Sequence, residues 1–103
     1  MNFDFSCIDD VELFLFERVV ENLKITHGHS LTEAVRLVND YHRKFTDAAF
    51  CERYNISIQT KSYFCHVEAL TMADQVQYYS ALGHIPNDEA FRRWQRKFRD
   101  TRR

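Results

Sequence analysis

Residues 7–25 read CIDDVELFLFERVVENLKI and contain the longest mainly apolar run of the chain. Apolar side chains recur there at intervals of three and four residues, which places them on one face of a helix. This stripe consists of Ile8, Val11, Leu15, Val19 and Leu23. Further apolar residues widen it to most of the circumference, namely Leu13, Phe14, Phe16 and Val20. We therefore expect a helix over residues 7–25, capped by Ser6, at the centre of the fold.

The sequence beyond this helix carries further start and stop signals. Ser30-Leu31-Thr32-Glu33 is a capping box, in which the Ser and Glu side chains satisfy each other's backbone N–H groups. Thr46 and Asn87 are suited to cap later helices. Gly28 and Gly83 are suited to end helices, because glycine accepts the left-handed conformation found there. These signals predict helices over residues 31–44, 47–54, 61–82 and 88–100.

The composition agrees with one all-α domain that spans residues 1–103. Hydrophobic residues make up 45% of the chain and aromatic residues 15%, with only two Gly and one Pro. These values exclude disorder and argue against the many turns of a β-sandwich. Residues 56–60 alternate like a strand, but a single strand has no partner, so we expect an extended connector there. The architecture that we predict is a compact bundle of about five helices.

The N-terminal sequence and the hydropathy indicate a cytoplasmic protein. Asp9 and Asp10 follow closely on the start of the chain, where a secretory signal would carry positive charge and then an apolar stretch. No apolar run approaches the roughly 20 residues needed to cross a bilayer. We therefore expect no membrane segment, and we expect the three cysteines to remain reduced, buried thiols.

The charge is divided between the halves of the chain, although the formal net charge is only −1. Residues 1–52 carry ten acidic and five basic side chains, whereas residues 53–103 carry five acidic and nine basic ones. Such asymmetry points to a charged partner, or to the two ends meeting each other. It is less typical of chemistry on a small substrate.

The acidic N-terminal end is the first candidate binding surface. Its carboxylates repel one another, so they do not stabilise the helix, and they would complement a basic surface on another macromolecule. Aromatic side chains that the core cannot hold would anchor such an interface. A merely solvated outer face is the alternative interpretation. The acidic candidates are Asp4, Asp9, Asp10, Glu12, Glu17 and Glu21, and the aromatic candidates are Tyr54, Tyr63, Tyr78 and Tyr79.

The basic C-terminal helix is the second candidate. Phe91, Trp94 and Phe98 fall on one face and are expected to dock the helix onto the core. The bases on its other sides could pair with the acidic first helix, remain solvated, or contact nucleic-acid phosphates, although the sequence pI of about 6.5 is low for a nucleic-acid-binding domain. They could also meet the acidic end of a second copy. These bases are Arg92, Arg93, Arg96, Lys97 and Arg99.

The sequence contains no catalytic or metal-binding motif. The five histidines do not occur in H-x-x-x-H or E-x-x-H pairs, and no C-x-x-C is present. Cys65 and His66 are adjacent, so on a helix they point in different directions and cannot act as nucleophile and base. We therefore expect no enzymatic activity, no cofactor and no metal.

As a whole, the chain resembles the small, cytosolic, mostly helical immunity proteins that bacteria keep against nuclease toxins of contact-dependent inhibition and related systems. The resemblance rests on size, aromatic richness, an acidic cluster that includes Asp9, Asp10 and Glu12, and the lack of catalytic motifs. It implies an inhibitor that binds a cognate toxin domain and covers its active site. The basic C-terminal end departs from an all-acidic surface and allows a mixed-charge interface.

Overall fold

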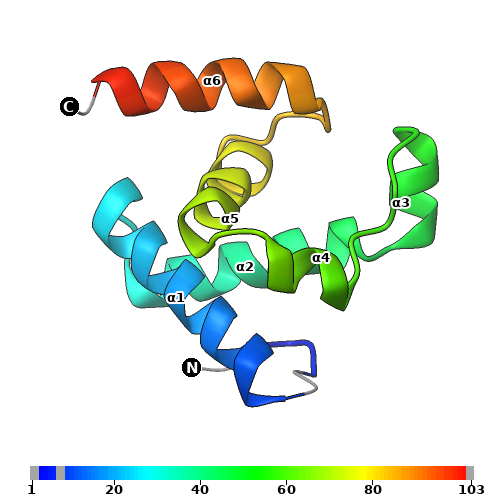
Figure 1. Ribbon diagram of the computed structural model, residues 1–103, viewed down its shortest axis with the longest axis horizontal. Coiled ribbons are helices and arrows are strands. Elements are labelled where there is room, and N and C mark those ends of the chain that lie inside the picture. Colours follow the sequence, from blue (N-terminus) through cyan, green and yellow to red (C-terminus); the bar gives the residue numbers. More distant parts are fainter. Residues whose placement is uncertain (1–2, 7–8, 102–103) are drawn as a thin grey trace.

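The computed structural model describes residues 3–6 and 9–101, and within them it contains helices and no strands. The all-α prediction is therefore confirmed. α1, α2 and α5 form the centre, α4 lies against α1, α3 follows α2, and α6 crosses one end of the molecule (Figure 1). The elements are α1 Asp10–His27, α2 Leu31–Phe45, α3 Ala48–Arg53, α4 Lys61–His66, α5 Ala69–Val76, the π-helical turn η1 Gln77–Ala81 and α6 Asp88–Thr101.

α1 begins later than the sequence predicts. Asp9 has an extended backbone (φ −149°, ψ 175°), and its carboxylate accepts the backbone N–H of Glu12 at 3.0 Å. Asp9 is therefore the N-cap, and the prediction of Ser6 as cap is wrong; Cys7 and Ile8 of the predicted helix lie outside the described residues. The end of α1 is as predicted, because Gly28 takes the left-handed conformation at φ 74°.

The caps of α2 and α3 are partly those predicted. Ser30 accepts the backbone N–H of Glu33 at 3.1 Å, but the Glu33 carboxylate pairs with the Arg36 guanidinium, so only half of the capping box forms. Asp47, rather than Thr46, caps α3 and accepts a backbone N–H at 2.8 Å. The Thr46 hydroxyl instead donates to a carbonyl at the end of α2 at 2.6 Å, which explains why it does not serve as the cap.

The single helix predicted over residues 61–82 is wrong, because the chain turns at Val67 and Glu68. Both residues have extended ψ angles, 133° and 142°, and separate α4 from α5. The turn lets α4 and α5 both pack on α1, and the Phe64 ring of α4 lies 5.4 Å from the Phe16 ring of α1. Tertiary packing thus overrides a continuous helical pattern that no glycine or proline interrupts.

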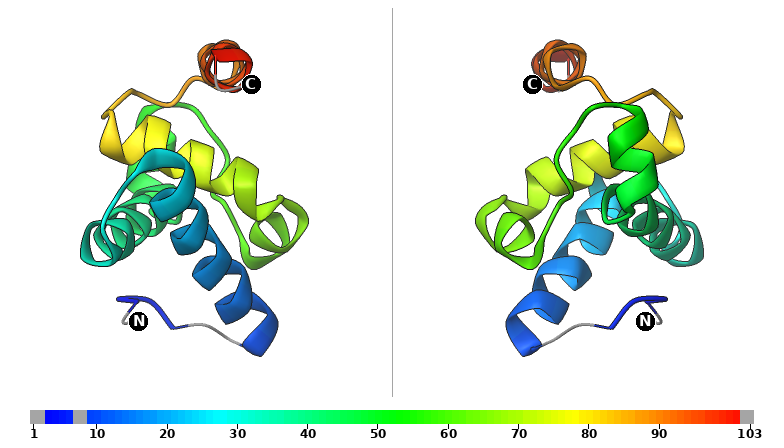
Figure 2. Two further views of the ribbon diagram at one scale, coloured as in Figure 1. Left: turned by 90° about the vertical axis from the view of Figure 1, so that its left-hand side faces the viewer. Right: turned by 90° about the vertical axis from the view of Figure 1, so that its right-hand side faces the viewer.

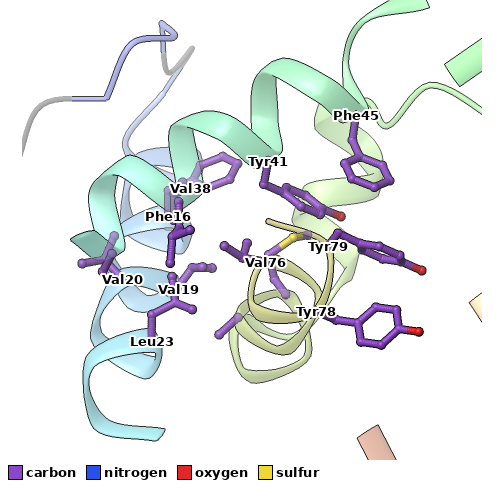
Figure 3. Close-up of a cluster of buried hydrophobic side chains, with 14 of the residues drawn as sticks. Phe16, Val19, Val20, Leu23, Val38, Tyr41, Phe45, Val76, Tyr78 and Tyr79 are labelled. Carbon is purple, nitrogen blue, oxygen red and sulfur yellow. The ribbon is translucent and has the colours of Figure 1, made fainter. Parts of the chain in front are cut away.

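The core lies between α1, α2 and α5 (Figure 3). The three helices contribute most of its side chains, and the opposite side of α1 is exposed to solvent. Val19 and Leu23 of the predicted apolar stripe are buried, whereas Val11 of the same stripe is 68% exposed and Ile25 is 74% exposed. Cys65 is exposed as well, so the expectation that the cysteines are buried is wrong for this residue. The buried apolar residues are Phe16, Val19, Val20, Leu23, Ala34, Leu37, Val38, Tyr41, Phe45, Cys51, Phe64, Met72, Ala73, Val76, Tyr78, Tyr79 and Phe91.

Two phenylalanines of α1 provide a test of this burial. Phe16 is 1% exposed and Phe14 is 59% exposed, although they are two residues apart. We expect Phe16→Ala to lower the free energy of unfolding by about 3 to 5 kcal/mol, because it leaves a cavity in the core. The matched change Phe14→Ala should lower it by no more than about 0.5 kcal/mol. Urea denaturation of both variants checks this, and similar losses would contradict the described orientation of α1.

Candidate functional site

The acidic and basic ends of the sequence lie at opposite ends of the molecule. α6 lies at one end, and the N-terminal turn of α1 lies at the other (Figures 1 and 2). Two arginines of α6 pair with carboxylates of the same helix and not with those of α1. Arg92 pairs with Asp88 at 3.0 Å, and Arg93 pairs with Glu89 at 3.3 Å. The idea that the two ends neutralise each other within one chain is therefore wrong.

Most of the predicted acidic candidates are accessible on the surface. Asp4, Asp9, Asp10 and Glu21 are exposed, and Glu17 is half-buried. The Asp9 carboxylate accepts a hydrogen bond from the Lys61 ammonium at 2.7 Å, which lowers the pKa of Asp9. Glu21 forms an exposed pair with Lys24 at 3.4 Å. Asp4, Asp10 and Glu17 have no ion-pair partner within the described residues, so they are the predicted carboxylates most available to a partner, and Asp10 and Glu17 are the two that lie on α1.

Glu12 does not belong to this surface, and its prediction as a partner-binding acid is wrong. Its side chain is buried at 4% exposure, and within the described part of the chain its Oε2 atom has no hydrogen-bond partner. The reason is helical spacing. Glu12 lies four residues before Phe16, and such pairs share a face, so the carboxyl follows Phe16 towards the core.

A row of exposed residues on α1, which we call the α1 outer face, was not predicted. Val11, Phe14, Arg18, Glu21 and Ile25 follow one another at intervals of three and four residues and therefore share one side of the helix. The guanidinium carbon of Arg18 lies 5.7 Å from the centre of the Phe14 ring, which is within the range of a cation–π contact. Asp10 and Glu17 flank this row. The same periodicity in the sequence could have identified it.

The tyrosine candidates are less accessible than predicted. Tyr78 and Tyr79 are buried, so they cannot act as interface anchors, and burial raises the pKa of Tyr79 to about 12. Adjacent residues can both be buried because η1 lies between two neighbours: Tyr78 packs on α6, and Tyr79 on both α2 and α6. Tyr63 is half-buried and its hydroxyl accepts a hydrogen bond from Gln75 at 3.0 Å. Tyr54 is half-buried against Phe50.

The outer side of α6 carries the basic candidates. Arg92, Arg93, Arg96 and Lys97 are exposed. An open hollow of about 480 Å³, which we call the α6 hollow, lies here and is lined by Arg93, Trp94, Arg96, Lys97 and Asp100. Within the described residues, Arg96 and Lys97 have no ion-pair partner. They are therefore the cations of α6 most available to an anionic group.

A buried carboxylate, Asp74, holds α6 against the rest of the molecule. Asp74 is 1% exposed and accepts hydrogen bonds from His27 Nε2 at 2.9 Å, from Gln95 Nε2 at 2.9 Å and from the Arg99 guanidinium at 3.3 Å. Phe98 adds a ring contact of 4.9 Å with His27. Arg99 is therefore occupied by an intramolecular ion pair and contributes less to a binding surface than predicted.

The hydrogen bonds determine the protonation state of this cluster. Burial is the largest single influence and raises the pKa of the Asp74 carboxyl, but the hydrogen bonds from His27 and Gln95 and the neighbouring charges, including that of Arg99, together lower it more, so the pKa lies below its ordinary value of 3.8. Asp74 is therefore an anion at neutral pH and can only accept hydrogen bonds. It follows that His27 carries its proton on Nε2.

Comparisons with protein families, with curated proteins and with solved structures yield no match to this chain. In the part of the chain that the structure describes, no helix combines the length and the apolar character needed to span a bilayer. Within the same residues, no three side chains of the His, Cys, Asp and Glu types are gathered in a way that could hold a metal ion.

The Asp74 cluster predicts a specific loss of stability on substitution. Asp74→Asn keeps the shape of the side chain but removes the charge that its donors share, so we expect a loss of about 1.5 to 3 kcal/mol in the free energy of unfolding at neutral pH. Because the pKa of Asp74 is lowered in the folded state, its contribution is present above pH 3.8 and is lost as the pH falls through the folded value.

Chemical denaturation of the wild type and of Asp74→Asn, from neutral pH to below pH 3.8, measures both the loss of stability and its dependence on pH. The stability difference between the two proteins should narrow below pH 3.8. Asp100→Asn is the matched control, because Asp100 is an exposed aspartate on α6, the helix that Asp74 holds in place, and the change should alter stability by no more than about 0.5 kcal/mol. A difference for Asp74→Asn that is the same at every pH would contradict the role of its charge.

Proposed function

We propose that this chain is a cytoplasmic protein-binding module that neutralises a partner through the α1 outer face. The partner class that we favour is a bacterial protein toxin, in particular a nuclease whose active site would be covered. The observation that supports the proposal is the α1 outer face, which exposes three apolar side chains, among them Phe14 at 59% exposure, beside Asp10 and Glu17. The toxin class rests on the resemblance to immunity proteins and on the acidic character of this surface.

The physical basis is a division of roles between apolar and charged side chains. Phe14 can fill a pocket on a partner, and aromatic side chains are enriched in the cores of protein interfaces. Val11 adds apolar contact area beside it. Asp10 and Glu17 lie beside them and would attract a basic surface. A nuclease has such a surface where it binds the phosphates of nucleic acid. Charges at the edge of an interface mainly speed association and select the partner.

Nucleic-acid binding through α6 is the second candidate, and the exposed pair Arg96 and Lys97 favours it. Asp88, Glu89 and Asp100 on the same helix reduce its net positive charge. Phosphate contacts release counterions, so retention of RNA or DNA on a filter would fall steeply with salt. An absence of retention at low salt would exclude this candidate.

The test needs a partner, which is first isolated from the native host by its binding to the immobilised wild-type chain. Its binding to variants of the α1 outer face is then compared. Phe14→Ala should weaken binding of that partner about 10-fold or more, which corresponds to about 1.4 kcal/mol or more, because it removes the aromatic anchor. The double variant Asp10→Lys with Glu17→Lys should slow association about 10-fold at low salt, and this effect should shrink at high salt. Surface plasmon resonance measures the rate and the affinity.

Glu52→Lys provides the control, because Glu52 is an exposed acid on α3, away from the α1 outer face. It should leave both the rate and the affinity unchanged. The purified partner should also lose its toxic activity when one equivalent of the wild-type chain is added. Equal binding by all variants would refute the role of the α1 outer face, and an unaffected partner activity would refute neutralisation.

A further inference from the structure

The α1 outer face and the α6 hollow have complementary chemistry. The α1 outer face presents the Phe14 ring with Asp10 and Glu17 beside it. The α6 hollow presents the Trp94 ring with Arg96 and Lys97 beside it. The first is therefore an aromatic projection with acidic neighbours, and the second an aromatic recess with basic neighbours.

The charges of these surfaces are available for pairing. Within the described residues, neither Asp10 and Glu17 nor Arg96 and Lys97 form an ion pair. The secondary charges match as well, because Arg18 lies over the Phe14 ring and Asp100 lines the α6 hollow. Each surface thus contains an aromatic group, a majority charge and one opposite charge, and the signs are reversed between them.

The two surfaces cannot meet within one molecule. α6 crosses one end, whereas the part of α1 that carries Asp10 and Phe14 lies at the other end (Figures 1 and 2). Complementary surfaces at opposite ends can be joined only between copies. A contact that uses a different surface on each copy is heterologous and leaves one surface of each kind free for the next copy.

We propose that the α1 outer face of one copy docks into the α6 hollow of a second copy, in a head-to-tail arrangement. Phe14 packs against Trp94, and Asp10 and Glu17 pair with Arg96 and Lys97 across the contact. Since each side of the contact is a single helix face, its area lies below that of stable interfaces, and the association is weak and dependent on concentration. It is also sensitive to salt, because the ion pairs are exposed to solvent.

Self-association of this kind covers the same face of α1 that we assign to a toxin. A bound toxin and a docked copy therefore exclude each other, and the partner competes with assembly. Docking between copies does not require the proposed toxin, because it follows from the charge and shape of this chain alone. A variant altered only in the α6 hollow keeps the α1 outer face and separates the two ideas.

Charge reversal on each surface provides the test. The first variant combines Asp10→Lys with Glu17→Lys, and the second combines Arg96→Glu with Lys97→Glu. Asp10, Arg96 and Lys97 are exposed, Glu17 is half-buried, and none of the four forms an ion pair within the described residues, so the circular dichroism spectrum should match that of the wild type. The urea midpoint should fall only slightly, because Asp10→Lys and Lys97→Glu each place a charge near a helix end whose dipole disfavours it. Sedimentation equilibrium over a range of protein concentrations then measures the average mass.

The expected results form a pattern that a nonspecific effect would not reproduce. The wild type should at least double its average mass with rising concentration at low salt, and it should return to the monomer at about 1 M salt, where the Debye length is about 3 Å. Each variant alone should remain a monomer, because its two surfaces then carry the same sign. An equal mixture of the two variants should assemble again, since the reversed surfaces complement each other.

A neutral truncation provides a second measurement that does not depend on charge. Phe14→Ala should weaken self-association about 10-fold at each salt concentration at which the wild type assembles, because it removes the aromatic contact. The proposal is overturned if the wild type stays monomeric at all concentrations at low salt, or if the mixed variants fail to assemble. It is also overturned if a monomeric wild type retains RNA through Arg96 and Lys97, because the α6 hollow would then bind phosphate groups.

Discussion

The burial of one carboxylate, Asp74, sets the positions of three helices. An anion can lie in a protein interior only where donors compensate for the lost water. Here the donors come from His27 at the end of α1 and from Gln95 and Arg99 on α6, while Asp74 itself belongs to α5. The three helices must therefore meet at this point. Because α6 follows the turn at residues 82–87 and crosses the end of the molecule, this cluster and the aromatic face beside it fix where its basic side points.

The two sides of α1 differ in burial. Its inner side supplies Phe16 and Leu23 to the core, and Glu12 is drawn inward because it shares that side. Its outer side leaves apolar groups in water, which costs free energy that the core must offset. Contiguous exposed apolar patches are typical of surfaces that bind another macromolecule. The outer side of α1 carries three exposed apolar residues, interspersed with Arg18 and Glu21.

Local signals in the sequence predicted most helices, because caps and amphipathic spacing act within a few residues. Gly28, Ser30 and Asn87 terminate or begin helices as expected. The break at residues 67–68 could not be predicted, since it arises from the packing of α4 and α5 on α1. The Asp74 cluster joins residues 47 and 21 positions apart, so no local pattern reveals it. The burial of Glu12 and the α1 outer face, in contrast, follow from helical spacing alone.

The division of charge along the chain gains its meaning from this geometry. If α6 lay beside the first turn of α1, the opposite charges would neutralise each other within one molecule, and the charge division would give no reason to expect a partner. Asp74 instead holds α6 at the far end, where Arg92 and Arg93 pair within their own helix and Arg96 and Lys97 do not pair within the described residues. Asp10 and Glu17 are unpaired in the same sense on α1. A small domain that keeps unpaired charges of opposite sign apart, each beside an exposed or half-buried aromatic ring, has two charged surfaces that can pair with each other only between molecules.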